Sequence, residues 1–385
     1  MSPEACSLLE GHVNFMLAIF LPNIGYCSET FLMRHVLGLY PPEKVVVVTL
    51  GDKKNKDLSF WSTTSREFNC HEFSSVNDTK AQFFSGSALR NKLASFLISC
   101  KVKVALLEYL NCFIWCVNVL NALDIKVFAH GHGFDVSASE AREEYAIYNC
   151  IEKVFTMSNY SKRKLIACGV SPHKIVVKPY GLPSQQSSMK VFKKSSDELK
   201  LLAVGRMVEK KNPLGTIKSI ETAIDGGAAL RLDFIGHGPL YEDVCTYVKS
   251  RGLNRFIHLH KDIPHCNVLE YMKISDIFIQ HSVVATNGDE EGLPNSIIEG
   301  LAHSLPVIST RHSGIPEIII NHFNGILSDQ NDIIGMARSI LYFFRNRDQV
   351  SRMGFNAYKS FVDNLTWEKE RQTLCHYFDK YINTN

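Results

Sequence analysis

Short apolar runs typical of buried strands alternate with helix-like segments along almost the whole chain. The runs lie at residues 16–21, 44–50, 102–107, 126–130, 153–157, 174–178, 201–205, 230–236, 256–260, 277–280 and 307–310. Because strands covered on both faces of a parallel sheet are almost continuously apolar, this alternation predicts a doubly wound α/β architecture. With 385 residues, 45% of them hydrophobic, the chain is long enough to form two cores.

A polar stretch without periodicity divides these runs into two sets. It covers residues 184–197 and is rich in serine, glutamine and lysine, a composition typical of a linker. We therefore expect an N-terminal domain at residues 1–183, a linker at 184–197 and a C-terminal domain at 198–365. Both domains should be Rossmann-like.

Charge and cysteine content indicate which partners and which cellular compartment to expect. A formal net charge of +3, with local basic clusters such as residues 162–164 and 193–194, gives no reason to expect a nucleic-acid partner. Eleven irregularly spaced cysteines indicate a reducing compartment rather than a disulfide framework. The apolar run at residues 15–21 has no basic stretch before it and ends at Pro22, so we expect a buried strand, no signal peptide and a cytoplasmic protein.

The segment from Glu291 to Ala302 is the most informative part of the chain for function. Pro294 suits the first position of a helix, and Gly292 lets a ligand approach the backbone closely. The free amides of such a helix start attract an anion such as phosphate. Glu291 before the helix and Glu299 inside it could then accept hydrogen bonds from hydroxyls at the two ends of one ligand. The alternative is a solvated acidic loop beside an amphipathic helix.

Two cations follow the apolar run at residues 201–205. Gly205 ends that run, Arg206 follows at once, and Lys211 lies five residues further on. Ligands of open α/β sheets bind at the carboxyl ends of strands, where both cations could contact phosphate oxygens. Taken alone, the segment is equally compatible with an exposed loop.

Histidines follow the run at residues 126–130. His130 and His132 lie close enough in the sequence to be two ligands of a metal ion, but the neighbouring sequence offers no third ligand. The chain also has no Asp-x-Asp triplet. The sequence therefore predicts no bound metal.

The stretches from Ser282 to Pro294 and from Ser309 to Glu317 resemble the donor site of retaining glycosyltransferases of family 4. They are most similar to the bacterial colanic-acid and amylovoran exopolysaccharide branch. The resemblance implies the GT-B fold, in which two Rossmann-like domains face each other across a cleft. It also implies that the C-terminal helix, at residues 366–385, packs back on the first domain.

The resemblance assigns roles to particular residues. His132, Arg206, Lys211 and Glu291 would be catalytic, with Arg206 and Lys211 on the diphosphate, Glu291 on the donor sugar and Glu299 on the ribose. His132 and Asp135 match the histidine-glycine-any-aspartate motif of the acceptor side. The full set of donor-binding residues would be Gly25, Gly205, Arg206, Lys211, Gly236, Gly238, Pro239, Ile263, Glu291, Gly292, Leu293, Pro294, Asn295 and Glu299.

Two positions depart from the family pattern. Asn212 stands where the family often has glycine, which leaves the local backbone shape open. Gly25 is a single glycine where many members have a pair, so the approach of that loop to the diphosphate is also open.

The implied activity is transfer of a hexose from a nucleoside-diphosphate sugar to a glycan or lipid-linked acceptor, with retention of anomeric configuration. The resemblance implies no cofactor and no metal, and it is compatible with peripheral contact at the inner face of the membrane. Whether the nucleotide is UDP or GDP stays open.

Other classes of function fit parts of the sequence. A nucleotide-sugar epimerase can share the fold, and product analysis with and without an acceptor would separate it from a transferase. A non-catalytic sugar-binding partner of another transferase is a further alternative. A dinucleotide oxidoreductase would need Gly-x-Gly-x-x-Gly, and the segment at Gly236 and Gly238 lacks the third glycine.

Overall fold

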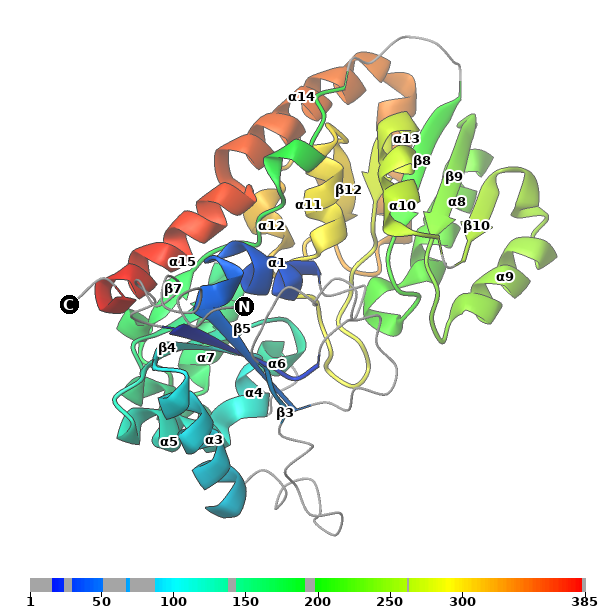
Figure 1. Ribbon diagram of the computed structural model, residues 1–385. Helices are drawn as coiled ribbons and strands as arrows, with labels where there is room; N and C mark the ends of the chain where they lie inside the picture. The colour runs from blue at the N-terminus through cyan, green and yellow to red at the C-terminus, as the bar shows by residue number, and fades with distance from the viewer. Residues whose placement is uncertain are drawn as a thin grey trace, which may run out of the picture. The chain divides into compact units, whose positions relative to one another are not determined.

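The computed structural model describes residues 16–23, 30–50, 67–69, 87–137, 143–190, 198–261 and 263–382 (Figure 1). The chain divides into two compact units. Unit 1 comprises Met1–Thr156, Lys162–Lys178 and Arg371–Asn385, and unit 2 comprises Met157–Ser161 and Pro179–Glu370. Gly25 and residues 191–197 of the expected linker lie outside the described residues.

Unit 1 contains a parallel sheet of seven strands in the order β3-β2-β1-β4-β5-β6-β7. The strands are β1 (Met16–Leu21), β2 (Val45–Thr49), β3 (Glu67–Asn69), β4 (Val102–Glu108), β5 (Lys126–Gly131), β6 (Lys153–Thr156) and β7 (Ile175–Val177). Every residue of β1 and β2 is buried, as expected for central strands covered on both faces.

The helices of unit 1 complete its core. They are α1 (Thr30–Gly38), α3 (Ser87–Ser99), α4 (Leu110–Phe113), α5 (Val117–Ala122), α6 (Phe134–Ser137) and the larger parts of α7 (Asn159–Ala167) and α15 (Trp367–Ile382). Leu89, Leu93 and Leu97, at four-residue spacing on α3, bury one face of that helix. Phe378 of α15 packs edge-on against Phe128 of β5, with ring centroids 4.8 Å apart.

Unit 2 contains a parallel sheet of six strands in the order β10-β9-β8-β11-β12-β13. The strands are β8 (Leu199–Val204), β9 (Leu230–Ile235), β10 (Ile257–His260), β11 (Ile277–Ile279), β12 (Val307–Thr310) and β13 (Gly325–Ser328). The helices are α8 (Pro213–Asp225), α9 (Tyr241–Ser250), α10 (His265–Ile274), α11 (Asn295–Ala302), α12 (Ile315–Ile318), α13 (Ile333–Arg345) and α14 (Arg347–Asn364). Helices α8 and α13 pack against each other.

Both sheets run outward from their first strand, then return to its other side and continue. This is the strand order of doubly wound folds, whose ligands bind beyond the carboxyl ends of the strands. The predicted α/β class is confirmed, and each predicted strand is present. The strands β3 and β13 were not predicted.

No helix in the described part of the chain is long and apolar enough to cross a membrane.

Candidate functional site

The candidate site in unit 2 begins where β8 ends. Gly205 and Arg206 follow the strand, and a short 3-10 turn, Glu209–Lys211, places Lys211 next to the sheet. Arg206 is exposed, and its side chain has no ion-pair partner within the described ranges. It is therefore available to a ligand at the carboxyl end of β8.

Asn212 gives this loop its shape. Its backbone is left-handed, with φ 40° and ψ 60°, a conformation that asparagine tolerates better than most residues. Its side chain also accepts a hydrogen bond from the Gly215 amide and so caps α8. The backbone shape that the sequence left open is therefore the one that glycine would favour.

Gly236 and Gly238 let the loops after β8 and β9 pack against each other. A Cβ on Gly236 would lie 1.9 Å from the Gly205 carbonyl oxygen, and one on Gly238 would lie 2.6 Å from the Met207 carbonyl oxygen. The Met207 amide donates to the His237 carbonyl at 2.9 Å. The two glycines are thus required for close backbone approach, whatever ligand binds nearby. Pro239 beside them is exposed.

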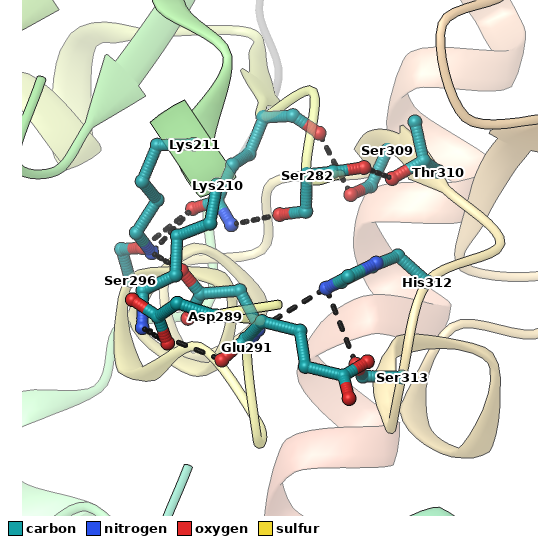
Figure 2. A network of polar contacts seen from close by, with 12 residues as sticks. Lys210, Lys211, Ser282, Asp289, Glu291, Ser296, Ser309, Thr310, His312 and Ser313 are labelled. Carbon is teal, nitrogen blue, oxygen red and sulfur yellow. Dashed lines mark hydrogen bonds and ion pairs between the residues drawn. The ribbon is translucent and has the colours of Figure 1, made fainter. Parts of the chain in front are cut away.

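Lys211 and Glu291 form an ion pair at the centre of the site (Figure 2). Lys211 Nζ lies 3.2 Å from Glu291 Oε1 and 3.3 Å from Gln280 Oε1. The same Gln280 oxygen accepts from Ser296 Oγ at 3.0 Å, and its amide group donates to Ser282 Oγ at 2.7 Å. Gln280 therefore links the lysine to the start of α11.

The electrostatics around Glu291 keep it ionised. Burial alone would raise its pKa, but the charges of Lys211 and Lys210 and the hydrogen bond from Lys211 together lower the pKa below its ordinary value. Burial lowers the pKa of the neighbouring His312, which favours the neutral ring. His312 Nε2 accepts from the Glu291 amide at 3.1 Å (Figure 2). This bond fixes the backbone of the loop before α11.

The start of α11 differs in detail from the prediction. Pro294 is the residue before the helix and has extended backbone angles, whereas the sequence predicted it at the first helical position. No side chain caps the helix and no acidic residue lies in its first turn, as far as the described residues show. The first-turn amides therefore remain suited to an anion. Gly292, Leu293 and Asn295 lie at this same helix start.

Glu299 lies further along α11 and has a hydrogen-bond partner of its own, His265. His265 Nε2 at the start of α10 lies 3.1 Å from Glu299 Oε1. Ile263, just before α10, is half-buried. The two carboxylates therefore occupy different surroundings, Glu291 against Lys211 and Glu299 against His265.

In unit 1, Asp135 fixes the turn after β5. Its carboxylate accepts from the amides of His132 and Leu110, both at 2.8 Å. Burial raises the pKa of Asp135, an effect that His132 and these amides offset in part. His132 itself is buried and lies against Glu108, with His132 Nε2 2.8 Å from Glu108 Oε2.

The structure therefore brings Gly205, Arg206, Lys211 and Glu291 to one end of the second sheet, with the start of α11. It also adds residues that the sequence did not indicate. Gln280 follows β11 without any motif, although a polar residue at the carboxyl end of a buried strand was a usable signal. His312 lies inside the stretch from Ser309 to Glu317, but the sequence assigned it no role. Glu108 and His35 lie far from His132 in the sequence, so no local pattern joins them.

Two parallel sheets of this strand order in one chain, with cations and carboxylates at the strand ends of the second, agree with the predicted GT-B fold. Solved structures agree. A glycosyltransferase from Rickettsia africae superposes with a TM-score of 0.79 at 16% identity, covering 97% of this chain and 100% of that one. Anabaena HepE in complex with UDP superposes with a TM-score of 0.78 at 12% identity, over 95% and 100% of the two chains. The prediction of the GT-B fold is confirmed.

Residues 184–360 match the family model "Glycosyl transferases group 1". Among curated proteins, the amylovoran biosynthesis glycosyltransferase AmsK of Erwinia amylovora is 30% identical over 230 residues. That match spans 58% of this chain and 56% of AmsK, little more than half the length of the relative. The predicted resemblance to the colanic-acid and amylovoran branch is confirmed.

Proposed function

We propose that the protein is a retaining glycosyltransferase of family 4. It would move a hexose from a nucleoside-diphosphate sugar to a glycan or lipid-linked acceptor in polysaccharide biosynthesis. The observation that carries the proposal is the position of Lys211, which lies between Glu291 and Gln280 at the end of β8, beside the uncapped start of α11. This arrangement combines a cation, a carboxylate and free amides within one site.

Each group has a task in the proposed reaction. When the bond between the sugar and the diphosphate breaks, negative charge grows on the leaving phosphate. Lys211, Arg206 and the first-turn amides of α11 would stabilise that charge. Lysine has three donors, so Lys211 can hold Glu291 and a phosphate oxygen together.

The carboxylates would hold the two ends of the donor. Glu291 would accept hydrogen bonds from hydroxyls of the sugar, and Glu299 from hydroxyls of the ribose. His132, with its backbone held by Asp135, would hydrogen-bond the transferred sugar near the reacting carbon. The acceptor would attack from the side of the leaving group and pass its proton to the departing phosphate, which retains the configuration.

We also propose that this chemistry needs no metal, because Arg206 and Lys211 already supply positive charge for the diphosphate. Contact with the inner face of the membrane would bring a lipid-linked acceptor within reach. The complex of Anabaena HepE with UDP supports a nucleoside diphosphate as the ligand type for this fold.

A thermal-shift screen tests the proposal. UDP, GDP and ADP, and then the corresponding nucleotide hexoses, would be added to the wild-type protein and to Arg206→Ala. A ligand that binds the folded state raises the melting temperature with its concentration. We expect a shift with UDP or GDP that is much smaller in the variant. Equal melting temperatures with and without every nucleotide would contradict the proposal.

A further inference from the structure

A single buried carboxylate in unit 1 contacts three imidazole rings. Glu108 is the last residue of β4, and Glu108, His35 and His130 are all 0% exposed. His35 Nδ1 lies 2.6 Å from Glu108 Oε1, while His130 Nδ1 and His132 Nε2 lie 3.1 Å and 2.8 Å from Oε2. The four side chains come from α1, β4, β5 and the turn after β5.

The chemistry of these contacts fixes the direction of each hydrogen bond. Burial would raise the pKa of Glu108, but the charge of His35, followed by the charge and hydrogen bond of His130 and the hydrogen bond of His132, holds it well below the ordinary value. An ionised carboxylate can only accept hydrogen bonds. In a neutral His132 the proton must therefore lie on Nε2, the nitrogen that faces Glu108.

The His132 ring is also held from other directions. The ring of Tyr109 lies 4.4 Å from it and the ring of Phe31 lies 4.8 Å from it, centroid to centroid. Tyr109 has φ 69°, a costly conformation for an aromatic residue, and it directly follows Glu108. Residues kept in such conformations concentrate at functional sites, where surrounding structure determines them.

Three of these residues, His35, Glu108 and His130, could suggest a zinc site, because histidine and glutamate are zinc ligands. Ligand atoms around a tetrahedral zinc ion lie about 3.3 Å apart, with the ion between them. Here each imidazole nitrogen lies 2.6 to 3.1 Å from a carboxylate oxygen, which is direct hydrogen-bond distance. The geometry favours a hydrogen-bond network.

We propose that Glu108 is a positioning residue that holds His132 in one orientation and one tautomer, with His35 and His130 completing its hydrogen bonds. The use of His132 on the donor sugar rests on the proposed function. The fixed orientation would determine how the ring meets a hydroxyl of the sugar. Glu108 would thus act on the reaction only through His132.

A double-mutant cycle tests the kinetic part. Glu108→Gln keeps the shape but brings an amide donor into the network, and we expect kcat to fall by about a hundredfold through misplacement of His132. Affinity for the nucleoside diphosphate, which unit 2 would bind, should stay within about twofold. In a His132→Ala background, Glu108→Gln should lower kcat by less than about threefold, because the ring that Glu108 positions is absent. An equal fall in kcat in both backgrounds would overturn the proposal.

Asp124→Asn alters an exposed carboxylate of unit 1 and is the matched control. It should change neither kcat nor the affinity for the nucleoside diphosphate.

A spectroscopic measurement tests the structural part without any activity. In wild-type protein labelled with ¹⁵N-histidine, the ring nitrogen shifts report which nitrogen carries the proton, and His132→Gln identifies the signal. We expect the Nε2-protonated form for His132. The Nδ1-protonated form, or stoichiometric zinc in the purified protein, would overturn the proposal. Correct tautomers with an additive kinetic cycle would instead show that His132 does not serve the proposed transfer, and would likewise overturn the catalytic part.

Discussion

Arg206 and Lys211 carry the same charge but lie in different surroundings. Arg206 is exposed, whereas Lys211 is paired with the buried Glu291. We expect Arg206→Ala and Lys211→Ala each to reduce turnover by roughly a hundredfold or more, the scale for removing one preorganised charge-stabilising donor. Only Lys211→Ala should also lower the melting temperature, because it leaves a buried carboxylate without its cation. Steady-state kinetics and thermal unfolding of both variants would check this, and rates within about threefold of wild type for both would contradict the diphosphate assignment.

Glu291 and Glu299 should respond differently to the same substitution. Glu299→Gln should weaken binding of the bare nucleoside diphosphate by roughly 1 to 3 kcal/mol, the scale of a lost charge-assisted hydrogen bond. Glu291→Gln keeps an oxygen that can accept from Lys211, so that binding should change little. Glu291→Gln should instead lower the rate of transfer, because contacts to the sugar matter most while charge develops at the reacting carbon. Calorimetry with the diphosphate and rates with the intact donor would separate the two, and equal losses of diphosphate affinity would show that the carboxylates do not divide the ligand.

Among the elements, α8 depends on one residue at its start. Asn212 both tolerates the left-handed backbone and caps the helix through the Gly215 amide. Asn212→Ala should therefore cost about 1 to 2 kcal/mol of stability from the lost cap and the left-handed conformation. Asn212→Gly relieves the backbone and should cost only a few tenths of a kcal/mol. Thermal unfolding of both variants would test the argument, and a larger loss with glycine than with alanine would contradict it.

Buried strands were predictable because their residues are almost continuously apolar. The exceptions have clear reasons. The strand β3 is only Glu67–Asn69, too short and polar for the pattern, and β13 begins at Gly325, where a Cβ would lie 2.3 Å from the Val307 carbonyl oxygen. Gly325 is required there because the backbones of β12 and β13 approach closely. In the sequence alone a glycine suggests a turn, so the strand was not predicted.

The site was predictable where a motif is local. Lys211 and Glu291 were singled out, but their direct pairing depends on how β8 and β11 lie in the sheet. Gln280 is placed by the same packing. The network of Glu108 joins α1, β4 and β5 through tertiary contacts alone. No local sequence pattern could therefore show that His35 and His130 contact the same carboxylate.

For the whole molecule, the proposed charge arrangement predicts the effect of metal removal. If Arg206, Lys211 and the start of α11 neutralise the diphosphate, activity should survive excess EDTA. The measurement is transfer rate after dialysis against EDTA, compared with the same protein supplied with magnesium or manganese. Complete loss on chelation, restored by either ion, would show that a metal neutralises the leaving group.

Helix α15 has a consequence for how the chain folds during synthesis. Its residues from Arg371 onward belong to unit 1, where Phe378 covers Phe128 of β5. All of residues 179–370 must leave the ribosome first, which takes roughly 10 to 40 s at typical elongation rates. Throughout that interval Phe378 is not yet available, so the aromatic surface around Phe128 stays exposed to solvent. The nascent first unit would therefore be a natural client for a chaperone, and unit 2 would be the part that completes its own core first.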